Sequence, residues 1–135
     1  METKRSTTYR KTFFKNTRPA IANRYFCTYC GRLLKEKDVT VDHLYPINVA
    51  QKSRRLRKKL KRKGITDIND IQNLVPACKK CNSRKGKRMG IWILRGKLGR
   101  HKAYWIARHG IRLMAFAIIM IMLLQTLNNA EIIHF

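Results

Sequence analysis

The chain is poor in acidic residues. It contains seven Asp and Glu residues against 31 Lys and Arg residues, which gives a formal net charge of +24. Residues 1–110 hold 30 of the basic and six of the acidic residues, so all the excess charge lies there. Such a surface suits the phosphate backbone of a nucleic acid, whose binding releases counterions. A ribosome-like or membrane-surface basic protein would carry the same charge, so charge alone does not distinguish these classes.

Other features are missing as well. Residues 1–14 are basic and polar and lack the apolar segment of a secretion signal, so we expect a cytoplasmic protein in a reducing compartment. No internal repeat, second zinc finger or helix-turn-helix is visible, which predicts loose sequence specificity. The 135 residues allow one small domain and an appendage, and a core of this size is marginal without a further source of stability such as a metal.

The four cysteines form two CxxC pairs, Cys27 with Cys30 and Cys78 with Cys81. Each CxxC turn can bring two sulfurs to one ion, and four thiolates suit a tetrahedral Zn²⁺. Disulfides would fit a secreted chain, and a redox CxxC would be a single motif in a βαβ unit. The spacing therefore predicts a structural zinc site made by all four cysteines.

Two short strands are expected between the cysteine pairs. The β-branched run at residues 39–41 predicts a strand that delivers Asp42 and His43 at its end. Residues 74 and 75 predict a second strand, which we expect to end at Pro76 because proline interrupts regular pairing.

A helix is expected to begin near Cys78. At 100° per residue, four side chains then share an arc of about 100°, so the zinc would anchor the helix while its polar residues point toward Asp42 and His43. The four are Cys78, Cys81, Asn82 and Lys85.

Three motifs follow one another in a fixed order. They are Cys-x-x-Cys-Gly at 27–31, Val-Asp-His-Leu-x-Pro at 41–46, and Asn-Leu-Val-Pro-Ala-Cys-x-x-Cys-Asn-x-x-Lys-Gly at 73–86. Together they resemble the HNH endonuclease family over roughly residues 24–88, and the ordered combination is far more specific than any single motif. The resemblance implies an α+β fold, a small zinc-stapled ββα-metal finger, in which zinc is structural and a separate divalent ion, Mg²⁺ or Mn²⁺, is catalytic.

The resemblance also implies a reaction and a set of roles. The protein would hydrolyse DNA phosphodiester bonds, with His43 as general base, Asp42 and Asn82 as ligands of the catalytic ion, and Asn73 holding the loop and orienting His43. The chemistry agrees, because an imidazole with a pKa near 6.5 can accept a proton near neutrality and oxygen ligands suit a hard cation. Asn82 stands where many members have histidine, a variant that the family also contains.

Two parts of the sequence offer cations that could bind the phosphates of a nucleic acid. Arg84 or Lys85 could lie near the scissile phosphate. The basic insert, residues 49–64, makes the link between His43 and Asn73 longer than is usual in the family. Nine of the twelve residues 52–63 are Lys or Arg, and the run predicts a basic helix that Gly64 ends. The expected nucleic-acid contacts are Arg54, Arg55, Lys58 and Lys59, although a solvated insert without specific contacts would have the same composition.

The sequence thus divides into a basic N-terminal arm (1–22), the nuclease domain with its insert (23–90), and a basic, aromatic linker with an apolar C-terminal helix (91–135). In the arm, Tyr9, Phe13 and Phe14 could stack on bases or dock on the core. The alternative function is nucleic-acid binding without catalysis, by an inactive zinc-ribbon protein.

The apolar run at residues 113–124 could pack against protein or associate with a membrane. Twelve residues are fewer than the roughly 20 that span a bilayer, which favours a buried helix or a homodimer contact. The run is nevertheless apolar on every side, and Trp and Tyr among basic residues precede it, which suits membrane association through residues 111–127.

Overall fold

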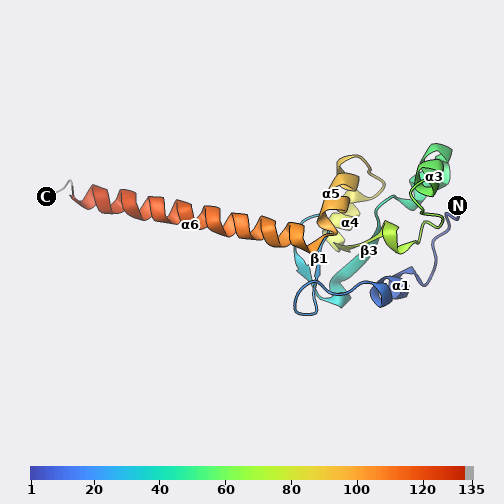
Figure 1. Cartoon of the computed structure of the whole chain (residues 1–135), viewed down its shortest axis with the longest axis horizontal. Helices are drawn as coiled ribbons and strands as arrows, with labels where there is room; N and C mark the ends of the chain where they lie inside the picture. Colours follow the sequence, from blue (N-terminus) through green and yellow to red (C-terminus); the bar gives the residue numbers. More distant parts are fainter. Residues whose placement is uncertain (133–135) are drawn as a thin grey trace. The chain divides into compact units, whose positions relative to one another are not determined.

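The computed structural model describes the backbone of residues 1–132 and the side chains as far as Asn129. It contains a compact unit, Met1–Lys102, and a second unit that begins at Ala103. The compact unit includes the arm and residues 91–102, which the sequence prediction treats as separate segments. Short helices and small antiparallel strands alternate along it (Figure 1), as expected for an α+β fold.

The first cysteine pair lies in a turn between two strands of two residues each, β1 (Tyr25–Phe26) and β2 (Leu33–Leu34). The amide of Gly31 donates to the Cys27 carbonyl at 2.8 Å, and the Cys27 amide donates to the Arg32 carbonyl at 2.8 Å. Gly31 has a φ of +76°, a conformation that residues with a Cβ rarely adopt. The glycine therefore lets the chain reverse immediately after the second sulfur.

The second sheet carries the candidate catalytic residues. Its strands β3 (Val39–His43) and β4 (Leu74–Cys78) are antiparallel, with Val39 opposite Cys78 and His43 opposite Leu74. A short 3-10 turn, η1 (Glu36–Asp38), leads into β3, and a second one, η2 (Ile71–Asn73), leads into β4.

The expected end of β4 at Pro76 was wrong, because the strand continues through the proline to Cys78. Pro76 lies opposite Val41, and its carbonyl accepts from the Thr28 amide at 2.8 Å, on the side away from β3. In an antiparallel pair, the N–H and C=O of one residue point to the same side. The N–H that proline lacks would thus also point away from β3, and the ladder loses no bond.

Helix α4 (Lys79–Lys85) follows β4 directly, so β3, β4 and α4 have the expected ββα order. Cys78 caps the helix, because its sulfur accepts from the Cys81 amide at 3.4 Å. Gly86, with a φ of +48°, ends it. The second cysteine pair therefore straddles the junction between strand and helix.

The basic insert forms two helices, α2 (Ile47–Lys52) and α3 (Arg54–Lys61). Ser53 separates them and caps α3 by accepting from the Leu56 amide at 3.2 Å. Leu56 and Leu60 are buried on one face of α3, and Gly64, at a φ of +78°, follows its end. The insert is thus an ordered part of the compact unit with its cations on the outer face.

The arm forms helix α1 (Tyr9–Asn16) and docks on the core. Phe13 is only 1% exposed, and its ring lies 5.2 Å from that of Phe14 and 6.3 Å from that of Tyr25. These contacts favour docking over base stacking for the two phenylalanines. On another side of the core, helix α5 (Ile91–Gly99) places Trp92 edge-on against Tyr29, with ring centroids 5.2 Å apart.

Helix α6 (Lys102–Ile132) is one continuous helix, as Figure 1 shows. Its large apolar side chains from Ile111 to Leu127 are exposed, from 40% at Met120 to 71% at Leu113. The stretch Lys102–Asn129 is long and apolar enough to cross a membrane, and none of its most apolar part is buried. Within its own unit the helix leaves this apolar surface uncovered.

Candidate active site

The two cysteine pairs meet as the spacing predicted. The four sulfurs of Cys27, Cys30, Cys78 and Cys81 all lie within 4.8 Å of one another. A tetrahedral Zn²⁺ with Zn–S bonds of about 2.3 Å holds its sulfurs roughly 3.8 Å apart, so the cluster fits the ion with little adjustment.

Metal binding would change the protonation of these thiols. Burial raises the pKa of Cys27 to about 11, and burial raises the pKa of Cys81 too. A bound cation deprotonates such thiols and offsets the cost of four crowded sulfurs. The donor set is thus suited to a structural zinc that ties the knuckle of β1 and β2 to the start of α4.

Asp42, near the end of β3, is held by two buried partners. The ammonium of Lys85 lies 2.9 Å from Asp42 Oδ2 and 3.2 Å from Oδ1, and it also donates to the His43 carbonyl at 2.8 Å. The hydroxyl of Tyr29 donates to Oδ2 at 2.5 Å. Burial, followed by the charge of Asp42, raises the pKa of Tyr29, which keeps this hydroxyl protonated. The carboxylate is fixed, and Oδ1 retains room for a further partner because a carboxylate oxygen offers about two acceptor positions.

Lys85 points toward Asp42 and His43, as the face of its helix predicted. It is 1% exposed and lies beneath Asp42, where its charge is matched by the carboxylate. A lysine in this position supports Asp42 and does not reach a phosphate at the surface.

His43 ends β3 with its side chain mostly buried. Its Nε2 lies 3.2 Å from Asn69 Oδ1. The amide nitrogen of Asn69 donates to the Lys4 carbonyl at 2.8 Å and to Asp67 Oδ1 at 2.9 Å, so Oδ1 is the atom that faces the imidazole as an acceptor. Nε2 then carries the proton, and Nδ1 remains the basic nitrogen. Burial lowers the pKa of His43 below 6.5, which favours the neutral imidazole at pH 7.

Asn73 is fully buried at the entry to β4. Its Oδ1 accepts from the Tyr45 amide at 2.8 Å, and its amide nitrogen donates to the Ile68 carbonyl at 2.8 Å. It therefore joins the segment after His43 to the segment before β4. The contact with the imidazole itself comes from Asn69.

Asp42, His43 and Asn82 line the same cleft, which has a volume of about 190 Å³. Asn82 reaches it from α4, and Arg5 reaches it from the arm. One carboxylate, one amide and one imidazole beside each other fit a hydrated Mg²⁺ or Mn²⁺, because such ions keep several waters and need few protein ligands.

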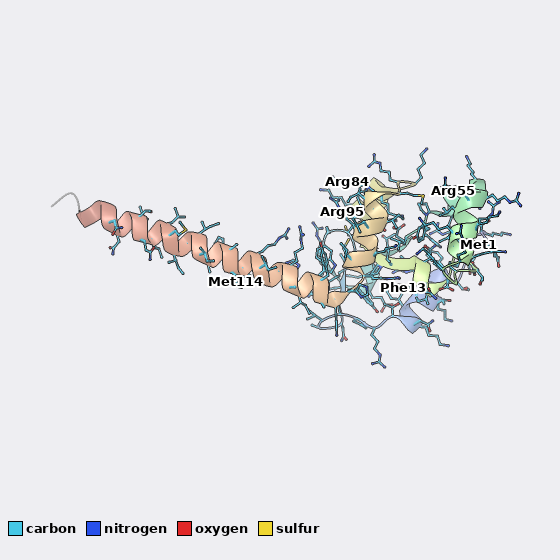
Figure 2. All side chains as sticks on the ribbon, turned by 45° about the horizontal axis from the view of Figure 1, so that its top comes forward. Met1, Phe13, Arg55, Arg84, Arg95 and Met114 are labelled. Atoms are coloured by element: carbon cyan, nitrogen blue, oxygen red, sulfur yellow. The ribbon has the colours of Figure 1, made fainter. Side chains whose placement is uncertain are left out.

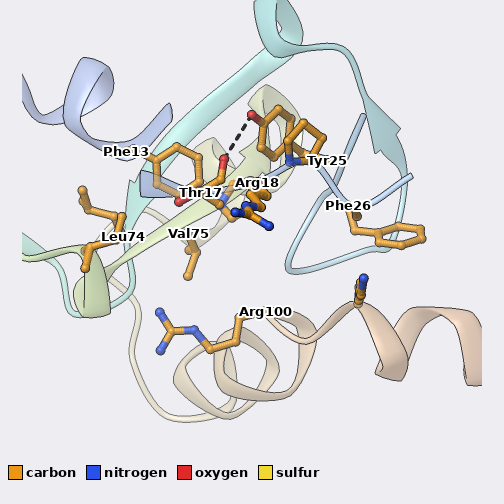
Figure 3. A pocket seen from close by; sticks show the side chains of 13 residues that line it. Phe13, Thr17, Arg18, Tyr25, Phe26, Leu74, Val75 and Arg100 are labelled. Carbon is orange, nitrogen blue, oxygen red and sulfur yellow. Dashed lines mark hydrogen bonds between the residues drawn. The ribbon is translucent and has the colours of Figure 1, made fainter. Parts of the chain in front are cut away.

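A different pocket, of about 340 Å³, lies beside β4 and is shown in Figure 3. Aromatic side chains such as Phe13 and Tyr25 line it together with Arg18 and Arg100. Its lining contains no carboxylate, histidine or cysteine, so it offers neither a general base nor a cation ligand. The cleft at His43, in contrast, contains both a carboxylate and an imidazole.

The expected nucleic-acid contacts are on the surface. Side chains of Arg55 on α3 and Arg84 on α4 extend away from the ribbon, as does Arg95 on α5 (Figure 2). The other exposed cations of α3 are Arg54, Lys58 and Lys59. These positions are compatible with contact to a phosphate backbone.

Sequence reasoning overlooked several polar and aromatic residues that contact the site: Arg5, Tyr9, Tyr29, Asn48, Asn69 and Lys87. Asn69 lies in a segment whose sequence predicts only a turn. Tyr29 lies between two cysteines, where the motif leaves the residue type open. The arm stands out in the sequence only by its charge and aromatic content, and its distance along the chain gives no sign that it reaches His43.

A strand pair, a helix, four clustered sulfurs and a cleft with Asp, His and Asn define a small metal-binding ββα domain. Residues 27–88 match the family model of the HNH endonucleases, and the four clustered cysteines within this match fit a metal site. This indicates a nuclease-type function with a nucleic acid as substrate. The comparisons with curated proteins and with solved structures gave no match.

Proposed function

We propose that this protein is a metal-dependent endonuclease that hydrolyses phosphodiester bonds of DNA, with His43 as general base. The observation that carries the proposal is the shared cleft of Asp42, His43 and Asn82 within an HNH domain. An inactive zinc ribbon would have no need to keep these three side chains at one cleft.

His43 is suited to removing a proton from water. Its Nε2 proton is directed to Asn69, which leaves Nδ1 basic, and burial lowers its pKa so that the neutral form predominates near pH 7. Asn69 fixes the ring, since its own amide is held by Lys4 and Asp67. The imidazole therefore does not have to reorient before it accepts the proton.

Asp42 and Asn82 would hold a divalent ion, which supplies charge relief to the phosphate and to the leaving oxygen when it is bound. Asp42 is preset for this role, because Lys85 and Tyr29 keep its carboxylate in one orientation. Asn82 adds a neutral oxygen from α4. Cys27, Cys30, Cys78 and Cys81 would hold the separate structural zinc.

DNA is the substrate that the charge distribution favours. The net charge of +24 is confined to residues 1–110, and α3 presents Arg54, Arg55, Lys58 and Lys59 to solvent, with Arg84 on α4. Contacts of this kind are independent of sequence. We expect broad cleavage of DNA in the reducing interior of the cell.

A location at a membrane is the second part of the proposal. Apolar side chains are exposed around the whole of α6 from Leu113 to Leu127, whereas a helix dimer needs only one apolar stripe. Arg108 and Arg112 precede the run, as is common at the interface of a bilayer. A lipid phase covers such a helix more completely than a second copy would.

The decisive experiment is incubation of supercoiled plasmid with purified protein and Mg²⁺ or Mn²⁺, with and without EDTA. We expect cleavage that EDTA abolishes and that His43→Ala lowers by at least about 100-fold, while DNA affinity and zinc content stay unchanged. His109→Ala, a change of the same kind in α6, is the matched control and should cut normally. Full activity of His43→Ala would remove the general base from the proposal.

A further inference from the structure

We propose that the N-terminal arm, residues 2–16, completes the active site by placing Arg5 on a substrate phosphate in the cleft, with Tyr9 as the residue that positions the Arg5 guanidinium. The inference rests on the proposed function, and it assigns a substrate-binding role to a segment outside the HNH domain, which covers residues 27–88.

Backbone contacts hold the beginning of the arm on the segment that precedes β4. The Glu2 amide donates to the Thr66 carbonyl at 3.0 Å, and the Ile68 amide donates to the Glu2 carbonyl at 3.0 Å. Further on, the Lys4 carbonyl accepts from Asn69, and the Ser6 amide donates to Asn69 Oδ1 at 3.1 Å. Residues on both sides of Arg5 are thus bound to one asparagine.

That asparagine is also the partner of the catalytic imidazole. Asn69 Oδ1 faces both the Ser6 amide and Nε2 of His43. The arm and the general base therefore share one fixed group, and any displacement of the arm would disturb Asn69. The position of Arg5 relative to His43 is therefore fixed by hydrogen bonds within the fold.

Tyr9 provides a second link between Arg5 and His43. The Arg5 guanidinium lies over the Tyr9 ring, 4.6 Å from its centroid, and donates to the Tyr9 hydroxyl. The Tyr9 ring also lies near the His43 ring, with centroids 5.2 Å apart and an angle of 39° between the planes. The tyrosine therefore connects the guanidinium to the imidazole.

The charges around the cleft show what Arg5 can bind. Arg5 is exposed and lines the cleft, and among the described residues no carboxylate is paired with it. Lys85, by contrast, is already neutralised by Asp42. An unpaired guanidinium beside a general base matches a phosphate, to which it can donate two parallel hydrogen bonds. Arg5 thus has the role of the phosphate-binding cation that the sequence had suggested for Arg84 or Lys85.

The test compares Arg5→Ala with Arg5→Lys and with Lys11→Ala, which removes the same charge from an exposed position on α1. We expect Arg5→Ala to lower kcat about 100-fold, as the loss of one transition-state donor does elsewhere. Arg5→Lys should recover part of the rate, because it restores the charge without the planar fork. Lys11→Ala should change KM and leave kcat unaltered. Added guanidinium ion should partly rescue Arg5→Ala, whereas the same concentration of potassium chloride should not.

Tyr9 is tested by a double-variant cycle. Tyr9→Phe keeps the ring on His43 but removes the hydroxyl that accepts from Arg5, so we expect a smaller loss of kcat than with Arg5→Ala. In the Arg5→Ala background the same change should have no further effect, because the two residues act as one unit. Additive losses would show that Tyr9 does not act through Arg5.

A measurement that needs no cleavage separates this inference from the proposed function. With zinc bound and no Mg²⁺ or Mn²⁺ added, titration of the ¹⁵N-labelled protein with a short duplex should shift the Nε resonance of Arg5, assigned by its absence in Arg5→Lys. If the wild-type protein does not cut DNA but this shift occurs, the proposed function fails and the phosphate contact stands. If the protein cuts DNA, and Arg5→Ala matches Lys11→Ala with no shift at Arg5, the inference is overturned.

Discussion

The compact unit and helix α6 differ in which side chains they expose to solvent. In the compact unit, aromatic and aliphatic side chains such as Phe13 and Leu60 are buried, while the cations face solvent. In α6 the apolar residues Leu113–Leu127 are exposed, and Arg112 is the charged residue that precedes them. The first pattern is that of a domain folded in water. The second leaves a large apolar surface for another phase or molecule to cover.

The two parts also differ in the function that we assign to them, which is catalysis for the compact unit and location in the cell for α6. Every side chain that we assign to catalysis or to zinc lies in the compact unit, between Arg5 and Lys85. Helix α6 contributes no cysteine, aspartate or acidic cluster between Lys102 and Asn129. We therefore expect substitutions of site residues in the compact unit to lower both activity and stability. Removal of α6 should change only the location of the protein in the cell.

The largest effect should follow the loss of a zinc ligand. Cys78→Ser should release about one equivalent of zinc and unfold the compact unit, because in small metal sites the binding free energy is folding free energy. Helix α6 should keep its helical circular dichroism in detergent micelles. Lys79→Ser, at the neighbouring exposed position, is the control and should retain zinc. A stable, zinc-free Cys78→Ser protein that cuts DNA would contradict a structural role for the metal.

The next effect concerns the buried pair of Lys85 and Asp42. Lys85→Met leaves a buried carboxylate without its cation, which should cost about 3–5 kcal/mol of unfolding free energy, measured by urea denaturation of the zinc-bound protein. Lys80→Met, exposed on the same helix, should stay within about 0.5 kcal/mol of the wild type.

The double variant Asp42→Asn/Lys85→Met sharpens this test, since it removes both charges. It should be more stable than Lys85→Met alone, because the unpaired charge is gone. Equal stabilities of Lys85→Met and Lys80→Met would show that the ion pair does not support the site.

The sequence predicted the parts of this fold that depend on local spacing. The CxxC pairs, the strand ending in Asp42 and His43, and the helix after Cys78 follow from short motifs and appear as expected. The prediction that β4 ends at Pro76 was wrong. A strand can continue through a proline when the position of the missing N–H points away from the neighbouring strand. Such a direction depends on which neighbour lies on which side, and that is a tertiary property.

The candidate site shows the same limit. The sequence predicted that Lys85 points toward Asp42, but it did not show that the two form a buried ion pair across 43 residues of chain. Arg5 reaches His43 only because Asn69 binds the backbone on both sides of it. Contacts across such separations have no signature in a single sequence, so the roles of Arg5 and Tyr9 came into view only with the structure.

A smaller effect is expected from the basic face of α3. Replacing its four expected phosphate-binding residues by Gln should weaken DNA binding and reduce the slope of log K against log salt by up to about 0.9 for each phosphate that the protein no longer neutralises. The four are Arg54, Arg55, Lys58 and Lys59. Zinc content and the response of cleavage to Mg²⁺ should not change.

The control for this variant removes four exposed cations elsewhere in the compact unit: Arg32, Lys35, Lys37 and Lys97. If the two variants have the same affinity and the same salt slope, α3 contributes only general charge. A steeper fall in affinity for the α3 variant would identify the insert as part of the DNA-binding surface.

The smallest effect on chemistry should come from removing α6. A chain cut after Gly110 retains every residue from Arg5 to Lys85, so its zinc content and its rate of plasmid cleavage should equal those of the full chain, measured in the same detergent. In cell fractionation the full chain should sediment with membranes and the shortened chain should stay in the supernatant. A shift from dimer to monomer on sizing, without a change in fractionation, would instead assign the apolar surface to a second copy. If the shortened chain is folded and zinc-loaded but does not cut DNA, α6 belongs to the active enzyme, and the assignment of catalysis to the compact unit alone is wrong.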